Sequence, residues 1–102
     1  MEKKANKYHL TLALTQYANG ATAPAKQLQL DFTNHDEIFE TVERLRLKEL
    51  FNDQELAAEF ANGLKLFSEV MIKNRSNPLF AELSPAFGSF MKRLKSMSRT
   101  TD

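Results

Sequence analysis

The stretch that decides the fold runs from Phe60 to Lys95 and reads FANGLKLFSEVMIKNRSNPLFAELSPAFGSFMKRLK. It holds five of the eight phenylalanines of the chain. Pro78 and Pro85 divide it, and each suits the first turn of a helix, where no amide donor is needed. We therefore expect a long helix, a short turn and a last helix capped by Ser84, with the aromatic side chains in the core.

The long helix has a clear start signal, because Asn52 can cap the first amides and Glu55 can complete a capping box. Its apolar arc is wider than that of an ordinary surface helix, which indicates a central position in the fold. We expect it to reach about Asn74 without a break at Gly63. Gly63 and Gly88 are the expected points of close approach between elements.

The N-terminal third alternates apolar and polar residues with period two, which is typical of half-buried strands. A turn-rich segment, residues 18–24, separates the two alternating runs and favours an antiparallel hairpin, because a parallel pair requires a longer crossover. The inward residues are predicted to be Tyr8, Leu10, Leu12, Leu14, Leu28, Leu30 and Phe32.

Between the hairpin and the long helix, a further helix is expected to begin at Asn34. The amide oxygen of Asn34 can accept from the first turn, and Glu37 follows three residues later. Ile38 and Val42 belong to its buried stripe. The helix is expected to end near Lys48, where basic side chains suit the negative end of the dipole.

Together these elements predict an α+β fold in which an N-terminal antiparallel β-hairpin packs on three to four helices. We expect one domain, residues 7–97, with flexible ends at residues 1–6 and 98–102. The predicted core consists of Leu10, Leu12, Leu30, Phe32, Ile38, Val42, Phe60, Leu64, Phe67, Met71, Phe87 and Phe90.

The bulk composition bounds the function. The chain has 102 residues, 42% of them apolar, and a net charge of +1, so a small globular domain is expected rather than a disordered or strongly basic protein. It has no cysteine, which excludes disulfides, thiolate catalysis and cysteine-bound zinc. We see neither a signal peptide nor an unbroken apolar run of about 18 residues, and we expect a cytoplasmic protein with no membrane association.

Residues with catalytic or metal-binding chemistry are sparse. His9 and His35 lie apart, without the spacing of a metal site. Asp36, Glu40 and Glu43 share a helix face, where a solvated surface is the simpler interpretation than acid–base catalysis. Neither a nucleophile motif nor a phosphate-binding glycine loop is apparent. We therefore predict a protein that is not an enzyme and that needs no metal or cofactor.

Cations gather near the C-terminus, at Lys92, Arg93, Lys95 and Arg99. They form a candidate contact for an anion, an acidic partner or nucleic acid. The phenylalanines of the same helix fall on its apolar face and not among these cations, which argues against base stacking. Favourable interaction with the helix dipole is sufficient to explain the patch.

The hairpin is the element least able to stand alone. Two strands are marginal in isolation, and both of their edges are open to pairing. A second copy of the chain could pair with an edge or stack on the outward face, giving a symmetric dimer. The candidate dimer face consists of His9, Thr11, Ala13, Thr15 and Gln29. Lys7 and Lys26 could instead protect the edges of a monomer.

Three segments carry a family resemblance: NHDEIFETVERLR (34–46), GLKLFSEVMIKNRSNPLF (63–80) and LSPAFGSFMKRLK (83–95). The chain resembles, over residues 7–96, a family of small bacterial proteins of unknown function. It departs from the family at Asn77 and Ala86, where relatives have histidine, so it could not share any role of those histidines. The resemblance implies a single-domain α+β fold and supplies no activity, ligand or site residue.

The sequence thus favours a small non-enzymatic protein-interaction module that forms a homodimer through its hairpin, with a further protein partner that the sequence does not identify. The first alternative is nucleic-acid binding through the basic C-terminal helix. The second is a small-molecule binder with a pocket between hairpin and helices.

Overall fold

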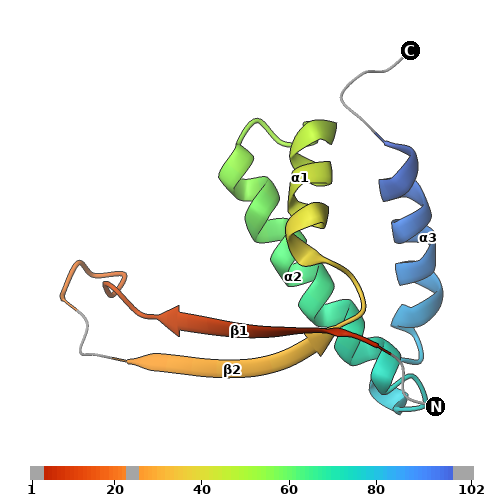
Figure 1. Ribbon diagram of the computed structural model, residues 1–102, viewed down its shortest axis with the longest axis horizontal. Helices are drawn as coiled ribbons and strands as arrows, with labels where there is room; N and C mark the ends of the chain where they lie inside the picture. Colours follow the sequence, from red (N-terminus) through yellow and green to blue (C-terminus); the bar gives the residue numbers. More distant parts are fainter. Residues whose placement is uncertain (1–3, 23–25, 98–102) are drawn as a thin grey trace. The chain divides into compact units, whose positions relative to one another are not determined.

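The computed structural model describes residues 4–22 and 26–97. These form an antiparallel hairpin followed by helices, and the predicted α+β class and element order are confirmed (Figure 1). The elements are β1 (Asn6–Ala13), β2 (Gln27–Asn34), α1 (Ile38–Lys48), α2 (Gln54–Lys73), the 3-10 helix η1 (Pro78–Phe80) and α3 (Leu83–Ser96). Residue contacts divide the chain into two compact units, a hairpin unit (Met1–His35) and a helical unit (Asp36–Asp102).

In the hairpin unit, β1 and β2 pair from Asn6↔Asn34 to Ala13↔Gln27. β1 thus begins one residue before the predicted start of the folded part. Beyond the strands, the amide of Gly20 donates to the carbonyl of Tyr17 at 2.9 Å and closes a tight turn. Gly20 has a φ of 92°, which glycine adopts without the steric cost that a side chain brings.

α1 begins at Ile38, four residues after the predicted start at Asn34, because its cap is a different residue. The N-cap is Glu37, whose carboxylate accepts from the amide of Glu40 at 2.7 Å. The predicted cap, Asn34, is the last residue of β2. The predicted end near Lys48 is confirmed, and Glu49 closes the helix with a φ of 53°.

α2 is capped by Asp53 and not by the predicted Asn52. The Asp53 carboxylate accepts from the amides of Glu55 and Leu56 at 2.9 and 3.3 Å. The helix is continuous to Lys73, which confirms an unbroken path through Gly63. The prediction that Gly63 is a point of close approach is wrong, because no atom of another element lies within 4 Å of a side-chain carbon built at Gly63.

In the segment after α2, each of the two prolines lies in the first turn of a helix. Asn77 caps η1 by accepting from the amide of Leu79, and Pro78 is the first residue of η1, as its fixed φ favours. α3 begins at Leu83, so the predicted cap at Ser84 is wrong. Pro85 is the third residue of α3, where the amide has no partner within the helix and its loss is tolerated. Gly88, like Gly63, faces open space.

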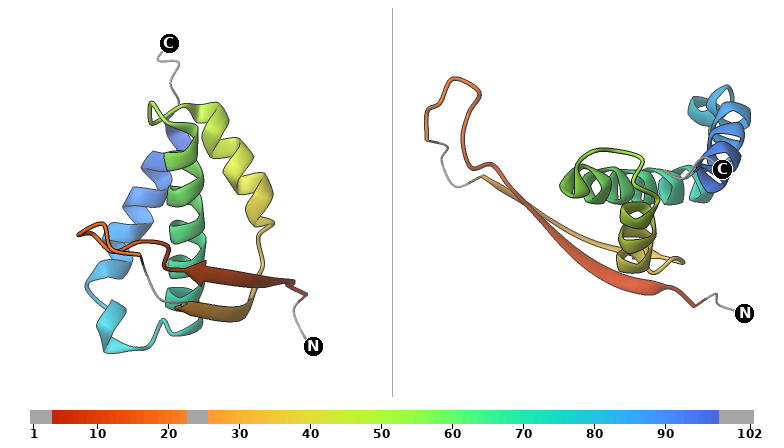
Figure 2. Two further views of the ribbon diagram at one scale, coloured as in Figure 1. Left: turned by 90° about the vertical axis from the view of Figure 1, so that its left-hand side faces the viewer. Right: turned by 90° about the horizontal axis from the view of Figure 1, so that it is seen from above.

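The helical unit has one shared core. Leu45 of α1, Ala61 and Leu64 of α2 and Leu94 of α3 are buried together. Five partly buried side chains surround them: Val42, Leu50, Phe60, Phe87 and Met91. Figure 2 shows the three helices from two further sides.

Phenylalanine rings link α2, η1 and α3. Phe60 contacts Phe51 and Phe90 edge to face, at centroid distances of 5.4 and 6.3 Å. Phe67 contacts Phe80 and Phe87 in the same manner, at 6.1 and 5.8 Å. Edge-to-face pairs of this kind contribute about 0.5–1.5 kcal/mol each beyond their buried area. The aromatic stretch therefore joins the helices, as the sequence predicted.

Several predicted core residues are nevertheless at the surface. Ile38, Leu64 and Met71 are buried, whereas Phe67 and Phe90 are exposed although each contacts two other rings. The prediction was also wrong for Leu10, Leu12 and Leu30 of the hairpin, which are exposed. The pattern of alternation identifies side chains that share a face, and it does not determine whether that face is covered.

Candidate functional site

One face of the hairpin presents a continuous set of leucines. Direct cross-strand pairing sets Leu10 opposite Leu30 and Leu12 opposite Leu28, and period-two alternation places all four on the same side. Leu14 continues the row beyond β1. We call Leu10, Leu12, Leu14, Leu28 and Leu30 the leucine face. All five are exposed, Leu12 to 63% and Leu28 to 55%.

Aromatic contacts bound the leucine face at both ends. Next to Leu10 and Leu30, the rings of Tyr8 and Phe32 are stacked with a centroid distance of 5.2 Å. At the other end, the Lys26 ammonium lies 5.7 Å from the centroid of the Tyr17 ring, in cation–π contact. The leucine face thus has an aromatic contact at each end and a charged group, the Lys26 ammonium, at one of them.

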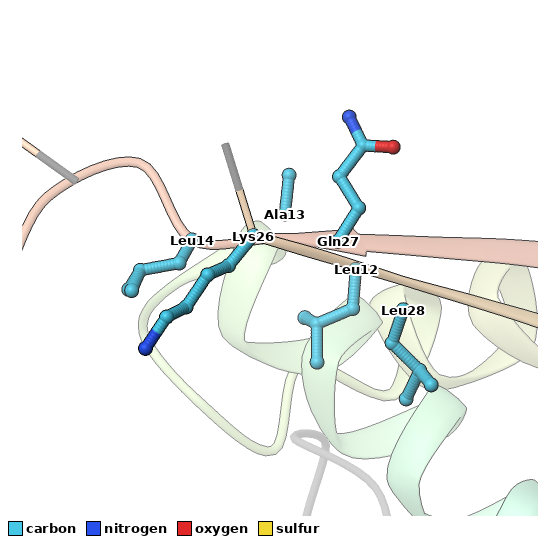
Figure 3. A pocket seen from close by; sticks show the side chains of 6 residues that line it. All are labelled: Leu12, Ala13, Leu14, Lys26, Gln27 and Leu28. Carbon is cyan, nitrogen blue, oxygen red and sulfur yellow. The ribbon is translucent and has the colours of Figure 1, made fainter. Parts of the chain in front are cut away.

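The surface is hollowed near Leu12 and Leu28, where a depression has a volume of about 360 Å³. Figure 3 shows the side chains of Leu12, Leu14 and Leu28 on one side of the hairpin, and those of Ala13 and Gln27 on the other. The wall of the depression is almost entirely hydrocarbon. Chemically, it can accept an apolar side chain and offers few groups that would orient a polar substrate.

The opposite face of the hairpin carries a hydrogen-bond network, which we call the polar face. His9 Nδ1 lies 2.6 Å from the Asp31 carboxylate, and His9 Nε2 lies 2.6 Å from the side-chain oxygen of Gln29. The Thr11 hydroxyl donates to the same oxygen at 2.9 Å. Both neighbours of the imidazole are acceptors, so this geometry suits a doubly protonated ring.

Those contacts act on the titration of His9. The hydrogen bond to Asp31, followed by that to Gln29, raises the pKa of His9 above its ordinary value of 6.5. The charged form is favoured because it donates two hydrogen bonds, whereas a neutral ring donates only one. The Asp31 and His9 side chains are both well exposed, so solvent weakens the interaction.

The structure places the residues of the predicted dimer face as follows. His9, Thr11 and Gln29 are joined in the polar network, Ala13 ends β1, and Thr15 lies beyond the strand. The side chains in the network already form hydrogen bonds with one another, so fewer of their donors and acceptors remain for a second copy. Dimerisation through this face stays a prediction. The leucine face was missed as a surface, although its alternation was visible, because the sequence pattern was interpreted as core.

The predicted cationic residues lie on one helix and only partly converge. Lys92, Arg93 and Lys95 are exposed on the last two turns of α3. Arg99 falls outside the described residues. Of the three described cations, Lys95 lines a groove to which cations from other helices also contribute, and Lys92 and Arg93 do not line that groove. Nucleic-acid binding stays a prediction.

The acidic residues of α1, and Asp36 in the segment before it, each contact a different cation. Asp36 contacts Lys65 at 2.7 Å. Glu40 and Glu43 each approach an arginine at 3.8 Å, Arg44 and Arg46 respectively. Within residues 4–22 and 26–97, no group of three histidine or acidic side chains is arranged to hold a metal ion. His35 is exposed.

Two general features of the described residues indicate the class of protein. None of the helices that they form is long and apolar enough to cross a membrane. Their element order, a hairpin followed by helices, defines a small α+β protein.

The chain belongs to DUF3861, a family described as a domain of unknown function with a solved structure, which it matches over residues 6–96. A solved structure is similar as well, the crystal structure of a protein of unknown function from Pectobacterium atrosepticum. That protein is 33% identical, with a TM-score of 0.79, and the match covers 92% of this chain and 100% of the other. No curated protein matched.

Proposed function

We propose that this protein is a non-enzymatic cytoplasmic interaction module whose hairpin docks a second copy of the chain through the leucine face. The observation that carries the proposal is the exposure of five leucines on one side of a two-stranded hairpin. Two strands with one uncovered apolar face are marginal in water. A second sheet laid on that face would form the two-layer arrangement by which sheets usually bury their apolar side.

A second copy is a suitable occupant because the face is complementary to itself. Leucine pairs repeat along the hairpin, so a two-fold axis that lies between the two faces, beside Leu12 and Leu28, sets equivalent residues against each other. The single cation at the end, Lys26, would lie at the rim of such an interface, where its ammonium stays in water. The depression beside Leu12 offers space for a leucine of the partner to interdigitate.

The magnitude of the stabilisation decides which affinity to expect. Completing the burial of one of these half-exposed leucines contributes roughly 1 kcal/mol. Association costs about 4–15 kcal/mol of translational and rotational freedom, so the leucines of two copies do not produce a tight complex. We expect a dimer that dissociates at micromolar concentrations and whose apparent stability therefore depends on protein concentration.

Sedimentation equilibrium over a range of about 5–500 μM brackets that dissociation constant. The decisive variant is Leu12→Glu/Leu28→Glu, which places two carboxylates on the leucine face. Its matched control is Thr11→Glu/Gln29→Glu, since Thr11 and Gln29 form the neighbouring cross-strand pair and face the other way. Both variants alter one pair and add two negative charges. Circular dichroism and the amide spectrum establish that each is folded.

The proposal predicts a wild-type dimer that the leucine variant dissociates and the control leaves intact. Loss of the dimer in the control alone would instead assign the interface to the polar face. A wild-type protein that stays monomeric up to the highest concentration would overturn the proposal, because the leucine face would then have no second copy to cover it. If the leucine variant is unfolded, concentration-dependent line broadening of the wild-type leucine methyl signals supplies the same test.

A further inference from the structure

A second surface lies in the helical unit and is independent of the hairpin. It is a groove of about 230 Å³ to which α1, α2 and α3 all contribute. Its floor consists of Leu45, Leu64, Leu94 and Met91, of which the three leucines belong to the buried core. The floor is thus rigid and apolar, as in most sites for small ligands.

The rim of this groove is cationic. Arg44 and Lys48 come from α1, Lys65 from α2 and Lys95 from α3, and all four line the groove. None of the described residues that line it is acidic. Four cations from three helices therefore surround an apolar floor, although the whole chain has a net charge of only +1. This charge distribution is complementary to an anion.

Contacts within the unit leave part of this positive charge uncompensated. The Lys48 ammonium donates to the backbone carbonyls of Lys95 and Met97 at 3.2 and 2.8 Å, which fixes it at the end of α3 without neutralising it. Among residues 4–22 and 26–97, the carboxylate that Arg44 approaches is that of Glu40, at a long distance of 3.8 Å.

The Lys65 ammonium is 2.7 Å from the Asp36 carboxylate, so its charge is partly balanced. For Lys95, no ion pair with another residue in the described part of the chain is found. Lys95 is therefore the rim cation best placed to respond to a ligand.

We propose that this groove binds a small amphipathic anion, with the apolar body of the ligand on the leucine and methionine floor and its acidic head group among the rim cations. At roughly 30 Å³ for each non-hydrogen atom, the volume that a water molecule occupies in the liquid, the groove accommodates about eight such atoms. A short-chain carboxylate or a monocyclic aromatic acid has this size and this distribution of polarity. A large or uncharged ligand does not match the groove.

Octanoate is a suitable probe, because its seven-carbon tail is within the size of the groove and its carboxylate can lie outside the floor, among the rim cations. The full-length protein is titrated with it. Methyl signals of Leu45, Leu64, Leu94 and Met91 report occupancy of the floor, and the titration gives a dissociation constant. 1-Octanol serves as the uncharged counterpart of similar length. The decisive variant is Lys95→Gln, and Lys92→Gln is its control: Lys92 lies on the same helix and is exposed, but does not line the groove.

We expect octanoate to shift the floor methyls with a dissociation constant in the millimolar range or below, and 1-octanol to bind more weakly. Lys95→Gln should weaken octanoate binding about two- to fivefold, the range that the loss of one exposed ion pair produces. Lys92→Gln should change it by less than about 1.5-fold, since Lys92 does not line the groove and an exposed charge that acts only through water contributes little.

Equal weakening by both variants would show diffuse attraction to the basic helix and would overturn the site. Floor methyls that do not move at about 10 mM octanoate would do the same. A dimerisation defect bears on neither outcome, because the leucine face shares no residue with the groove.

Discussion

The three glycines of the chain offer the sharpest test of the local structure, because one substitution should act with opposite signs at different positions. Gly63 and Gly88 lie inside α2 and α3, and a methyl group added to either meets no atom within 4 Å. Glycine in a helix interior costs about 1 kcal/mol relative to alanine. Gly63→Ala and Gly88→Ala should therefore each stabilise the helical unit by about 0.5–1 kcal/mol.

Gly20→Ala supplies the opposite sign. The added methyl again meets no neighbour, but the φ of 92° is one that residues with a side chain rarely adopt. The left-handed conformation costs such residues roughly 1–2 kcal/mol, which should weaken the turn of the hairpin. Steric crowding of the added methyl group thus cannot explain a difference in stability among the three variants, and the backbone conformation at each position distinguishes them.

Urea unfolding followed at 222 nm measures the two helical variants, and amide exchange of β1 and β2 measures the hairpin variant. All measurements use one protein concentration, since self-association changes apparent stability. In a thermal melt followed at the same wavelength, each helical variant should raise the melting temperature by about 2–8 °C. Amide exchange in the hairpin of Gly20→Ala should be faster. A fall in stability for Gly63→Ala would refute the reasoning and would restore the interpretation that another element approaches Gly63 closely.

Two further predictions follow from single contacts. Asp53→Ala should destabilise α2 by about 1 kcal/mol in urea unfolding, because the Asp53 carboxylate accepts from two free amides, whereas Asn52→Ala should have little effect; equal losses would contradict the assigned cap. The His9 imidazole should titrate above pH 6.5 by NMR, and Asp31→Asn should lower that pKa. Since the folded state raises this pKa, the contribution of His9 to hairpin stability should be fully present below pH 6.5 and should disappear as the pH rises through the folded pKa. An unchanged His9 titration in Asp31→Asn would contradict the assigned role of Asp31 in raising the pKa of His9.

Element type and order were accessible from the sequence because they depend on periodicity. The period-two runs and the proline punctuation identified the hairpin, the long helix and α3. Helix starts were less accessible. At α2, Asn52 and Asp53 are adjacent and both can cap, and the structure selects the residue whose carboxylate reaches two amides. At α1, the strand continues through Asn34, so the cap moves to Glu37.

Burial was the least accessible property, for a physical reason. Alternation in a strand states which side chains share a face, and a leucine face looks the same in sequence whether it is covered by its own chain or left for a partner. The same limit applies to α2, where a wide apolar arc indicated contact from several sides and yet Phe67, Val70 and Ile72 are exposed. In so small a domain the surface is large relative to the volume, and part of the apolar set remains outside the core.

The two candidate surfaces differ in how a sequence could reveal them. Lys92, Arg93 and Lys95 form a cluster in the linear sequence, but Arg93 points about 100° away from Lys92, and Lys95 is the member of the cluster that lines the groove. The cations that converge on the groove are separated by as many as 51 positions, from Arg44 to Lys95, and only the packing of three helices brings them to one rim. Cations that are adjacent in sequence therefore need not form one binding site. Cations from different helices that surround an apolar floor can select a ligand by shape as well as by charge.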